Sequence, residues 1–89
     1  PPREQLLFAF AAYNAGPGNL RKFRAKAAEM GLDPNRWFGN VENGAAAIVG
    51  RETVQYVSNI YKYYIAYDML AEHAQMSNKH ATEAKSTVE

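Results

Sequence analysis

The strongest constraint on the fold is an apolar stretch that stops at a rigid corner. Leu6–Tyr13 contains no β-branched residue and is followed by Asn14 and then by Gly16-Pro17-Gly18. Good helix formers without β-branching favour a helix, predicted over Arg3–Asn14, rather than a buried strand. Because this helix is apolar all round, it is expected to be buried on every side. Proline fixes its own φ and glycine permits positive φ, so Asn14 is expected at a defined corner, where it can bind a ligand's amide.

Composition excludes several classes of protein. The chain has 89 residues, enough for at most one small domain, and its ten Lys plus Arg nearly balance nine Asp plus Glu. This balance gives no reason to expect nucleic acid as a partner, and the longest apolar run is too short for membrane insertion. The absence of cysteine excludes disulfides and thiolate zinc sites. Because the chain begins at Pro1 without a methionine, it is expected to be a piece of a longer protein.

No cofactor or metal is expected. Gly16-Pro17-Gly18 follows a helix and continues into neither a dinucleotide nor a phosphate-loop fingerprint. His73 and His80 are seven residues apart, which places them on one face of a continuous helix, but no carboxylate pattern accompanies them. A serine nucleophile elbow and a Cys-His pair are also absent from the sequence. The remaining possibilities are carboxylate chemistry and pure binding.

A second helix is predicted from an N-cap at Gly18 or Asn19 to Met30, with Gly31 as its stop. Its apolar face is narrow and comprises Leu20, Phe23, Ala27 and Met30. The basic residues between them are therefore expected to point outward, as a solvated face or as a surface for an anionic polymer; they are Arg21, Lys22, Arg24 and Lys26.

Two shorter segments follow. Asp33–Phe38 is predicted to form a helical turn, with Asp33 as N-cap and Pro34 at its first helical position. Trp37 and Phe38 then either fill a small core or line a sugar site. Gly39–Gly50 is predicted to be a loop with one or two helical turns.

The longest helix is predicted to open at Gly50–Thr53 and to end near Leu70 or Glu72. Two adjoining apolar stripes, rich in tyrosine, cover more than half of its circumference, so it is expected to be central in the fold. Residues 71–89 are polar and are predicted to be a frayed helix that passes into a disordered tail. The predicted organisation is thus one all-α domain over residues 1–70 and a tail over residues 71–89.

Two motifs carry a family resemblance. Ala12-Tyr13-Asn14-Ala15-Gly16 and, some forty residues later, Glu52-Thr53-Val54-Gln55-Tyr56-Val57-Ser58-Asn59-Ile60 resemble the second half of the lysozyme-like catalytic domain of lytic transglycosylases of the soluble (SLT) type. The stretch from Ala28 to Trp37 most resembles the membrane-bound F-type members. The resemblance covers roughly Gln5 to Tyr67, and it implies an all-α, lysozyme-like fold of which this chain is the C-terminal part.

The resemblance also implies an activity. Lytic transglycosylases cleave the β-1,4 bond between N-acetylmuramic acid and N-acetylglucosamine in peptidoglycan. One glutamic acid protonates the leaving oxygen, and the 6-hydroxyl of the substrate attacks to give a 1,6-anhydro product. By resemblance, Asn14 binds the glycan near the scissile bond, while Tyr13, Ala15 and Gly16 shape the groove floor. Tyr56 is the expected hydrogen-bond partner of the catalytic acid, although packing along its helix is compatible with the same position.

The catalytic acid itself is missing. In this family it lies upstream in a Glu-Ser segment that is followed by Gly-Leu-Met-Gln, and neither occurs here. Glu4, Glu29, Glu42 and Glu52 do not match that position, and Glu52 is interpreted as a helix-capping residue. The chain alone is therefore predicted not to cleave glycan. Its expected partners are peptidoglycan strands, together with the missing N-terminal half of the domain or a second copy of the chain, whose helices would cover the surplus apolar surface. The implied location is the bacterial periplasm or the outer-membrane-associated cell envelope.

Two alternatives stay open. A lysozyme-like muramidase would share the fold but release a free reducing end. A non-catalytic helical module would instead bind another protein through the aromatic face of the long helix. The second alternative predicts that Asn14→Ala leaves glycan binding unchanged, while Tyr63→Ala and Tyr67→Ala abolish binding to that protein.

Overall fold

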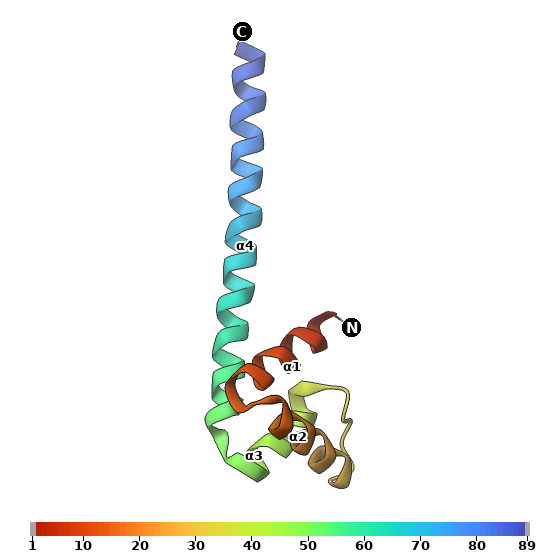
Figure 1. The fold of residues 1–89 in the computed structure, drawn as a ribbon. Helices are drawn as coiled ribbons and strands as arrows, with labels where there is room; N and C mark the ends of the chain where they lie inside the picture. The colour runs from red at the N-terminus through yellow and green to blue at the C-terminus, as the bar shows by residue number, and fades with distance from the viewer. Residues whose placement is uncertain (1, 89) are drawn as a thin grey trace.

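The all-α class is confirmed by a computed structural model, which describes the backbone of residues 2–88 and the side chains of residues 2–74. Within residues 2–88 the chain forms helices and no strand; the elements are α1 (Pro2–Ala15), α2 (Pro17–Glu29), η1 (Trp37–Val41), α3 (Glu42–Val49) and α4 (Arg51–Val88). The first three α-helices gather around one end of α4, which extends away from them (Figure 1). The overall extents are 65 × 21 × 18 Å.

The first helix forms as predicted, but its expected burial on all sides is wrong. Only Glu4, Leu7 and Ala11 are buried, and they share one face of α1. Ala9 is exposed on the opposite face, and Tyr13 is 85% exposed. The neighbouring helices cover one side of α1, so an apolar sequence all round does not produce all-round burial in this chain.

The turn into α2 is tighter than predicted. Gly16 has a φ of 94°, and α2 begins immediately at Pro17 rather than after an N-cap at Gly18 or Asn19. Proline suits this first position because its missing N–H would have no helical partner there. Along α2, Phe23 and Ala27 are buried as predicted, whereas Met30 is 46% exposed.

The basic face of α2 is only partly directed outward. Arg21 and Lys22 are exposed, but Arg24 is half-buried and lies with its guanidinium 5.1 Å from the centre of the Phe8 ring. Arg24 also donates hydrogen bonds from Nε to the Pro34 carbonyl oxygen (2.8 Å) and from Nη2 to Asn35 Oδ1 (2.7 Å). The expectation that Arg24 points outward is therefore wrong, because it anchors the segment that follows α2.

That segment is a turn and not the predicted helical turn. Asp33 accepts a hydrogen bond at Oδ1 from the Asn35 backbone N–H (2.8 Å), so it caps a turn rather than a helix. Helical structure resumes in η1, which Phe38 and Gly39 interrupt with non-helical backbone angles. Trp37 is fully buried, which confirms its predicted alternative as a core residue, and Phe38 is 37% exposed at the rim. Two turns of α3 follow, as predicted for Gly39–Gly50.

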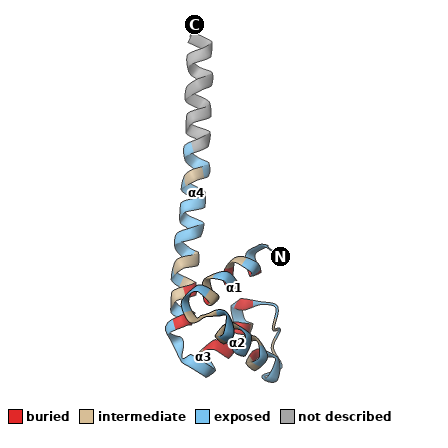
Figure 2. Cartoon of the chain, viewed as in Figure 1, coloured by how far each residue is buried: buried red, intermediate tan, exposed pale blue. Residues whose placement is uncertain are grey.

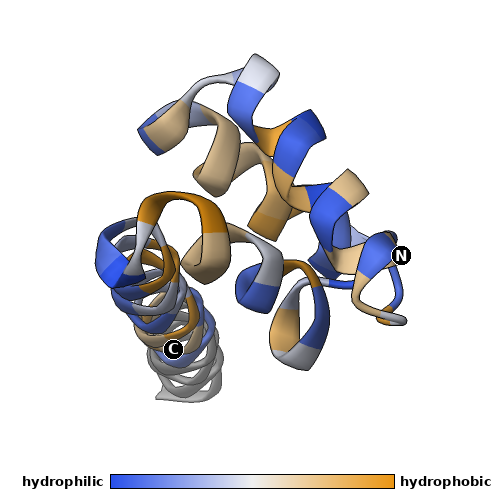
Figure 3. Ribbon diagram, turned by 90° about the horizontal axis from the view of Figure 1, so that it is seen from below, coloured by the Kyte–Doolittle hydropathy of each residue, from blue (hydrophilic) through white to orange (hydrophobic). Residues whose placement is uncertain are grey.

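The core is small and lies where the short helices meet the start of α4 (Figure 2). Its fully buried members are Leu7, Ala11, Phe23, Ala27, Trp37, Val41, Ala45 and Val57. Helices α2 and α3 cross very closely at Gly44, where an added Cβ would lie 2.3 Å from the Phe23 carbonyl oxygen. Viewed from below, nearly along α4, each short helix carries both hydrophobic and hydrophilic stretches (Figure 3).

Only the start of α4 joins the core. Thr53 and Val57 are buried, and Val54, Tyr56, Ile60 and Tyr61 are half-buried. From Lys62 to Leu70 every residue is exposed, so the prediction that this helix is central holds for its first three turns and is wrong beyond them. The backbone stays helical to Val88, past the predicted end near Leu70 or Glu72. The side chain of His80 and most of the predicted tail lie outside the described side chains, and the division at residue 70 stays a prediction. No helix among the described residues is both long and apolar enough to cross a membrane.

Candidate functional site

The predicted corner is built by the end of α1 and the start of α2. The Gly16 backbone N–H donates to the Ala12 carbonyl oxygen (2.8 Å), which closes the last turn of α1. Asn19 reaches back from α2, and its Nδ2 donates to the Ala15 carbonyl oxygen (2.8 Å). This side-chain bond satisfies a carbonyl that the end of α1 leaves without a helical partner. The corner is thus fixed from both helices.

A single hydrogen bond joins the two sequence motifs. The Thr53 hydroxyl of α4 donates to Asn14 Oδ1 of α1 over 2.9 Å, across 39 positions of sequence. Thr53 is only 5% exposed, whereas Asn14 is exposed. The bond therefore connects a buried hydroxyl to an amide at the surface, and it places the start of α4 against the end of α1.

The other predicted site residues lie at the end of α1, at the turn that follows it, and on α4. Tyr13 is 85% exposed, and Ala15 and Gly16 are half-buried at the turn. Tyr56 is three residues after Thr53 on the same side of α4 and is half-buried against the core. Asn14 and Thr53 are thus brought together, with Tyr56 on the adjoining turn. The roles of Tyr13, Asn14, Ala15, Gly16 and Tyr56 in glycan binding stay predictions.

Two polar residues that were not among the predicted site residues, Asn19 and Glu4, organise this region. Asn19 is a predicted N-cap candidate, and its position four residues after Ala15 also permits the side-chain bond to the Ala15 carbonyl oxygen. Glu4 does not match the sequence position of the family's catalytic acid, and it has a structural role instead. It is 5% exposed, and its Oε2 accepts a hydrogen bond from the Trp37 backbone N–H over 2.9 Å. The signal for Glu4 in the sequence is its spacing of three from Leu7 on the apolar face of α1.

The environment of Glu4 stabilises its ionised form. Burial of the carboxyl raises its pKa, but the hydrogen bond from Trp37, the contact with Arg3 and the charge of Arg36 together lower the pKa below its ordinary value. The Arg3 Nη2 lies 3.1 Å from Glu4 Oε1. A general acid needs a carboxyl that keeps its proton near neutral pH. Glu4 is therefore a structural carboxylate, held by the Arg3 guanidinium and the Trp37 backbone N–H.

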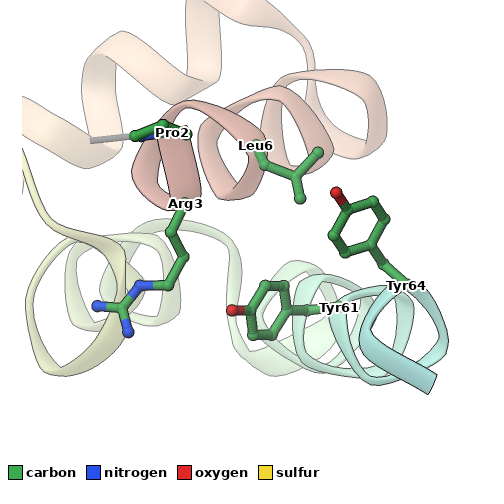
Figure 4. Close-up of a pocket in the computed structure, with 5 residues that line it drawn as sticks. All are labelled: Pro2, Arg3, Leu6, Tyr61 and Tyr64. Atoms are coloured by element: carbon green, nitrogen blue, oxygen red, sulfur yellow. The ribbon is translucent and has the colours of Figure 1, made fainter. Parts of the chain in front are cut away.

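A cavity of about 240 Å³ lies elsewhere, between the start of α1 and the first half of α4. Its lining residues are Pro2, Arg3, Leu6, Tyr61 and Tyr64 (Figure 4). Arg3 and Tyr61 both contact Phe38, at ring-centre distances of 5.8 and 5.6 Å respectively. None of the predicted site residues lines this cavity, so it is separate from the Asn14–Thr53 corner.

Comparison with known proteins places the chain beside one group of enzymes. It is 37% identical over 78 residues to membrane-bound lytic murein transglycosylase F of Desulfosudis oleivorans, covering 71% of this chain and 17% of that protein. The proteins of the same name from Shewanella woodyi and Stutzerimonas stutzeri are 33% and 38% identical, over 72% and 64% of this chain and 16% and 14% of their own lengths. This chain matches part of a lytic transglycosylase. The resemblance predicted from the two motifs is thus confirmed.

The match to lytic transglycosylases is partial in length. The chain spans less than one fifth of these curated relatives, which are named as membrane-bound. No family model matches the chain. No solved structure matches it either. The Thr53–Asn14 hydrogen bond joins the two motifs on which the family resemblance was predicted.

Proposed function

We propose that this chain is the glycan-binding part of a lysozyme-like lytic transglycosylase domain. The parent enzyme would cleave the bond between N-acetylmuramic acid and N-acetylglucosamine in peptidoglycan and leave a 1,6-anhydro product. The observation that carries the proposal is the 2.9 Å hydrogen bond between Thr53 and Asn14, because it brings the two family motifs together at one exposed corner. The names of the relatives support the same enzyme class.

The proposal assigns binding and not proton transfer to the chain. Asn14 offers an exposed amide, and the exposed ring of the preceding residue, Tyr13, offers a flat apolar surface for a sugar. Tyr56 would hold the acid that another part of the enzyme supplies. Glu4 is engaged by Arg3 and by the Trp37 backbone N–H, so the proposal does not use it as that acid. A location in the cell envelope follows from the substrate and agrees with the membrane-bound relatives.

A chimera tests the activity. The segment of the Desulfosudis relative that matches this chain would be replaced by the residues of this chain, and purified peptidoglycan would be digested with the chimera and with the chain alone. We expect release of fragments by the chimera that are lighter by one water than muramidase products, and no release by the chain alone. Fragments with a free reducing end would favour the muramidase alternative. Cleavage by the isolated chain would refute the assignment of the acid to another part.

The exposed face of α4 favours a second candidate, a helical module that binds protein. Tyr63, Tyr67 and Leu70 are 71%, 75% and 68% exposed and recur at the spacing of one helix face. In the proposed enzyme this face would meet the rest of the domain or a second copy of the chain. Under the protein-binding alternative, Tyr63→Ala with Tyr67→Ala abolishes capture of that partner, and Asn14→Ala leaves glycan binding unchanged. A loss of glycan binding in Asn14→Ala alone would exclude this candidate as the main function.

A further inference from the structure

Thr53 has a side chain that is placed to control another residue. It is 5% exposed, and its hydroxyl donates its single hydrogen bond to Asn14 Oδ1, at 2.9 Å. A β-branched side chain in a helix has few rotamers, so the Thr53 oxygen can occupy only a few positions, and in this structure it lies against Asn14 Oδ1. Loss of the bond would leave a buried hydroxyl unsatisfied, which proteins avoid. The bond is therefore a defined contact from a buried donor.

The contact fixes which end of the Asn14 amide faces outward. An asparagine amide has one acceptor oxygen and one NH2 group with two donors. Because the oxygen is held by Thr53, the NH2 group occupies the other branch of the planar amide. Asn14 is exposed, and among the described residues no protein group accepts a hydrogen bond from its Nδ2. The corner therefore presents donors and hides its acceptor.

We infer that Thr53 is a positioning residue that orients the Asn14 amide so that its NH2 group donates to an acceptor oxygen of the bound glycan. This inference rests on the proposed function and refines the chemistry of its ligand. The group recognised at this corner is a carbonyl or hydroxyl oxygen, not a donor such as an ammonium group. Holding the amide in one orientation before binding reduces the ordering cost that a free side chain would add.

Three variants distinguish the role of the Asn14 NH2 group from that of the Thr53 hydroxyl. Asn14→Asp keeps an oxygen that accepts from Thr53 but replaces the donor group by a second acceptor. Thr53→Val keeps the shape of the side chain and removes the hydroxyl, while Thr53→Ser restores a hydroxyl. Binding of N-acetylated chitohexaose to the full chain would be measured by calorimetry. We expect the Kd to rise about tenfold or more in Asn14→Asp and about threefold to tenfold in Thr53→Val, and to stay within about twofold in Thr53→Ser.

Nuclear magnetic resonance gives a readout that does not depend on the ligand. With the Asn14 oxygen against Thr53, the Nδ2 protons should lack strong nuclear Overhauser contacts with Thr53 in the free chain. They should shift on addition of chitohexaose. Strong Overhauser contacts between the Nδ2 protons and Thr53 would show that the amide has the opposite orientation, and they would overturn the inference. Unchanged affinity in Asn14→Asp would also overturn it.

A failure of this inference can be distinguished from a failure of the proposed function. If the wild-type chain does not bind chitohexaose, the proposed glycan-binding function fails, and the Overhauser contacts still decide the orientation of Asn14. If Thr53→Val does not fold by circular dichroism, Asn14→Asp carries the test, because the Asn14 side chain is exposed. Wild-type affinity in a folded Thr53→Val variant would contradict the positioning role.

Discussion

Replacement of Glu4 by alanine is expected to remove a large share of the stability of this small domain. The Glu4 side chain is 6% exposed, and its two oxygens hold the Trp37 N–H at 2.9 Å and the Arg3 guanidinium at 3.1 Å. Glu4→Ala leaves the buried backbone N–H of Trp37 without an acceptor. A hydrogen bond to a charged group contributes about 1.5–3 kcal/mol, and an unsatisfied buried donor costs a similar amount. We expect a loss of about 2–3 kcal/mol in the free energy of unfolding.

The position of Trp37 makes this prediction simple to measure. It is the only tryptophan, and it is fully buried, so its fluorescence reports unfolding directly. In urea titrations the midpoint of Glu4→Ala should fall, and its melting temperature should fall by about 10–20 °C for a domain of this size. Glu29→Ala is the matched control, since Glu29 makes only a surface pair with Lys26 at 3.6 Å, and it should change stability by less than about 0.5 kcal/mol. Equal stability of Glu4→Ala and wild type would refute the structural role of Glu4.

The pH dependence of the same bond gives an independent check. Although burial raises the pKa of Glu4, the Trp37 hydrogen bond and the arginine charges lower it below 4.5 in the folded chain. A carboxyl with a lowered folded pKa contributes stability that is complete above its unfolded pKa and is lost as the pH falls through the folded value. The stability difference between wild type and Glu4→Gln should therefore shrink on acidification below about pH 4.5. A difference that grows in acid would contradict the assignment.

Three further predictions concern backbone and packing. Gly44→Ala should cost more than about 2 kcal/mol or prevent folding, because its Cβ would collide with the backbone of α2; thermal melting measures this. Gly16→Ala should lower the free energy of unfolding by about 1–2 kcal/mol, because Gly16 has a φ of 94°. Gly18→Ala, whose added Cβ would meet no close backbone atom, should be neutral or slightly stabilising. Equal effects of the two substitutions would contradict the turn geometry. Arg24→Met should cost about 1–2 kcal/mol in urea titrations and Arg21→Met almost nothing, since only Arg24 anchors the segment after α2.

Local sequence signals predicted the helices because those signals lie in neighbouring residues. The absence of β-branching in Leu6–Tyr13, the glycine and proline at the corner, and the apolar spacing of Phe23 and Ala27 all act within one helix or turn. They gave α1, most of α2, the short α3 and the start of α4. The start of α2 was misplaced because Gly16 alone supplies the positive φ, which leaves Pro17 free to begin the helix.

Contacts between distant residues were beyond the reach of those signals. The bond from Glu4 to Trp37 spans 33 positions and the bond from Thr53 to Asn14 spans 39, so no local pattern reveals either. Burial of α1 and α4 was overestimated for a related reason. Apolar periodicity reports which face can be covered, and the amount of covering surface depends on the rest of the structure. The short helices do not extend along α4 beyond its start, so the tyrosines farther along α4 are exposed.

The most direct test of the central claim is a titration of the labelled chain with N-acetylated chitohexaose, followed residue by residue by nuclear magnetic resonance. We predict saturable shifts that are centred on residues 12–16 and Thr53, together with a shift of the Asn14 side-chain NH2 signals. The exposed face of α4 around Tyr63 and Tyr67 should remain unchanged. Absence of saturable shifts, or shifts centred on that face of α4, would contradict the assignment of the corner as the glycan site.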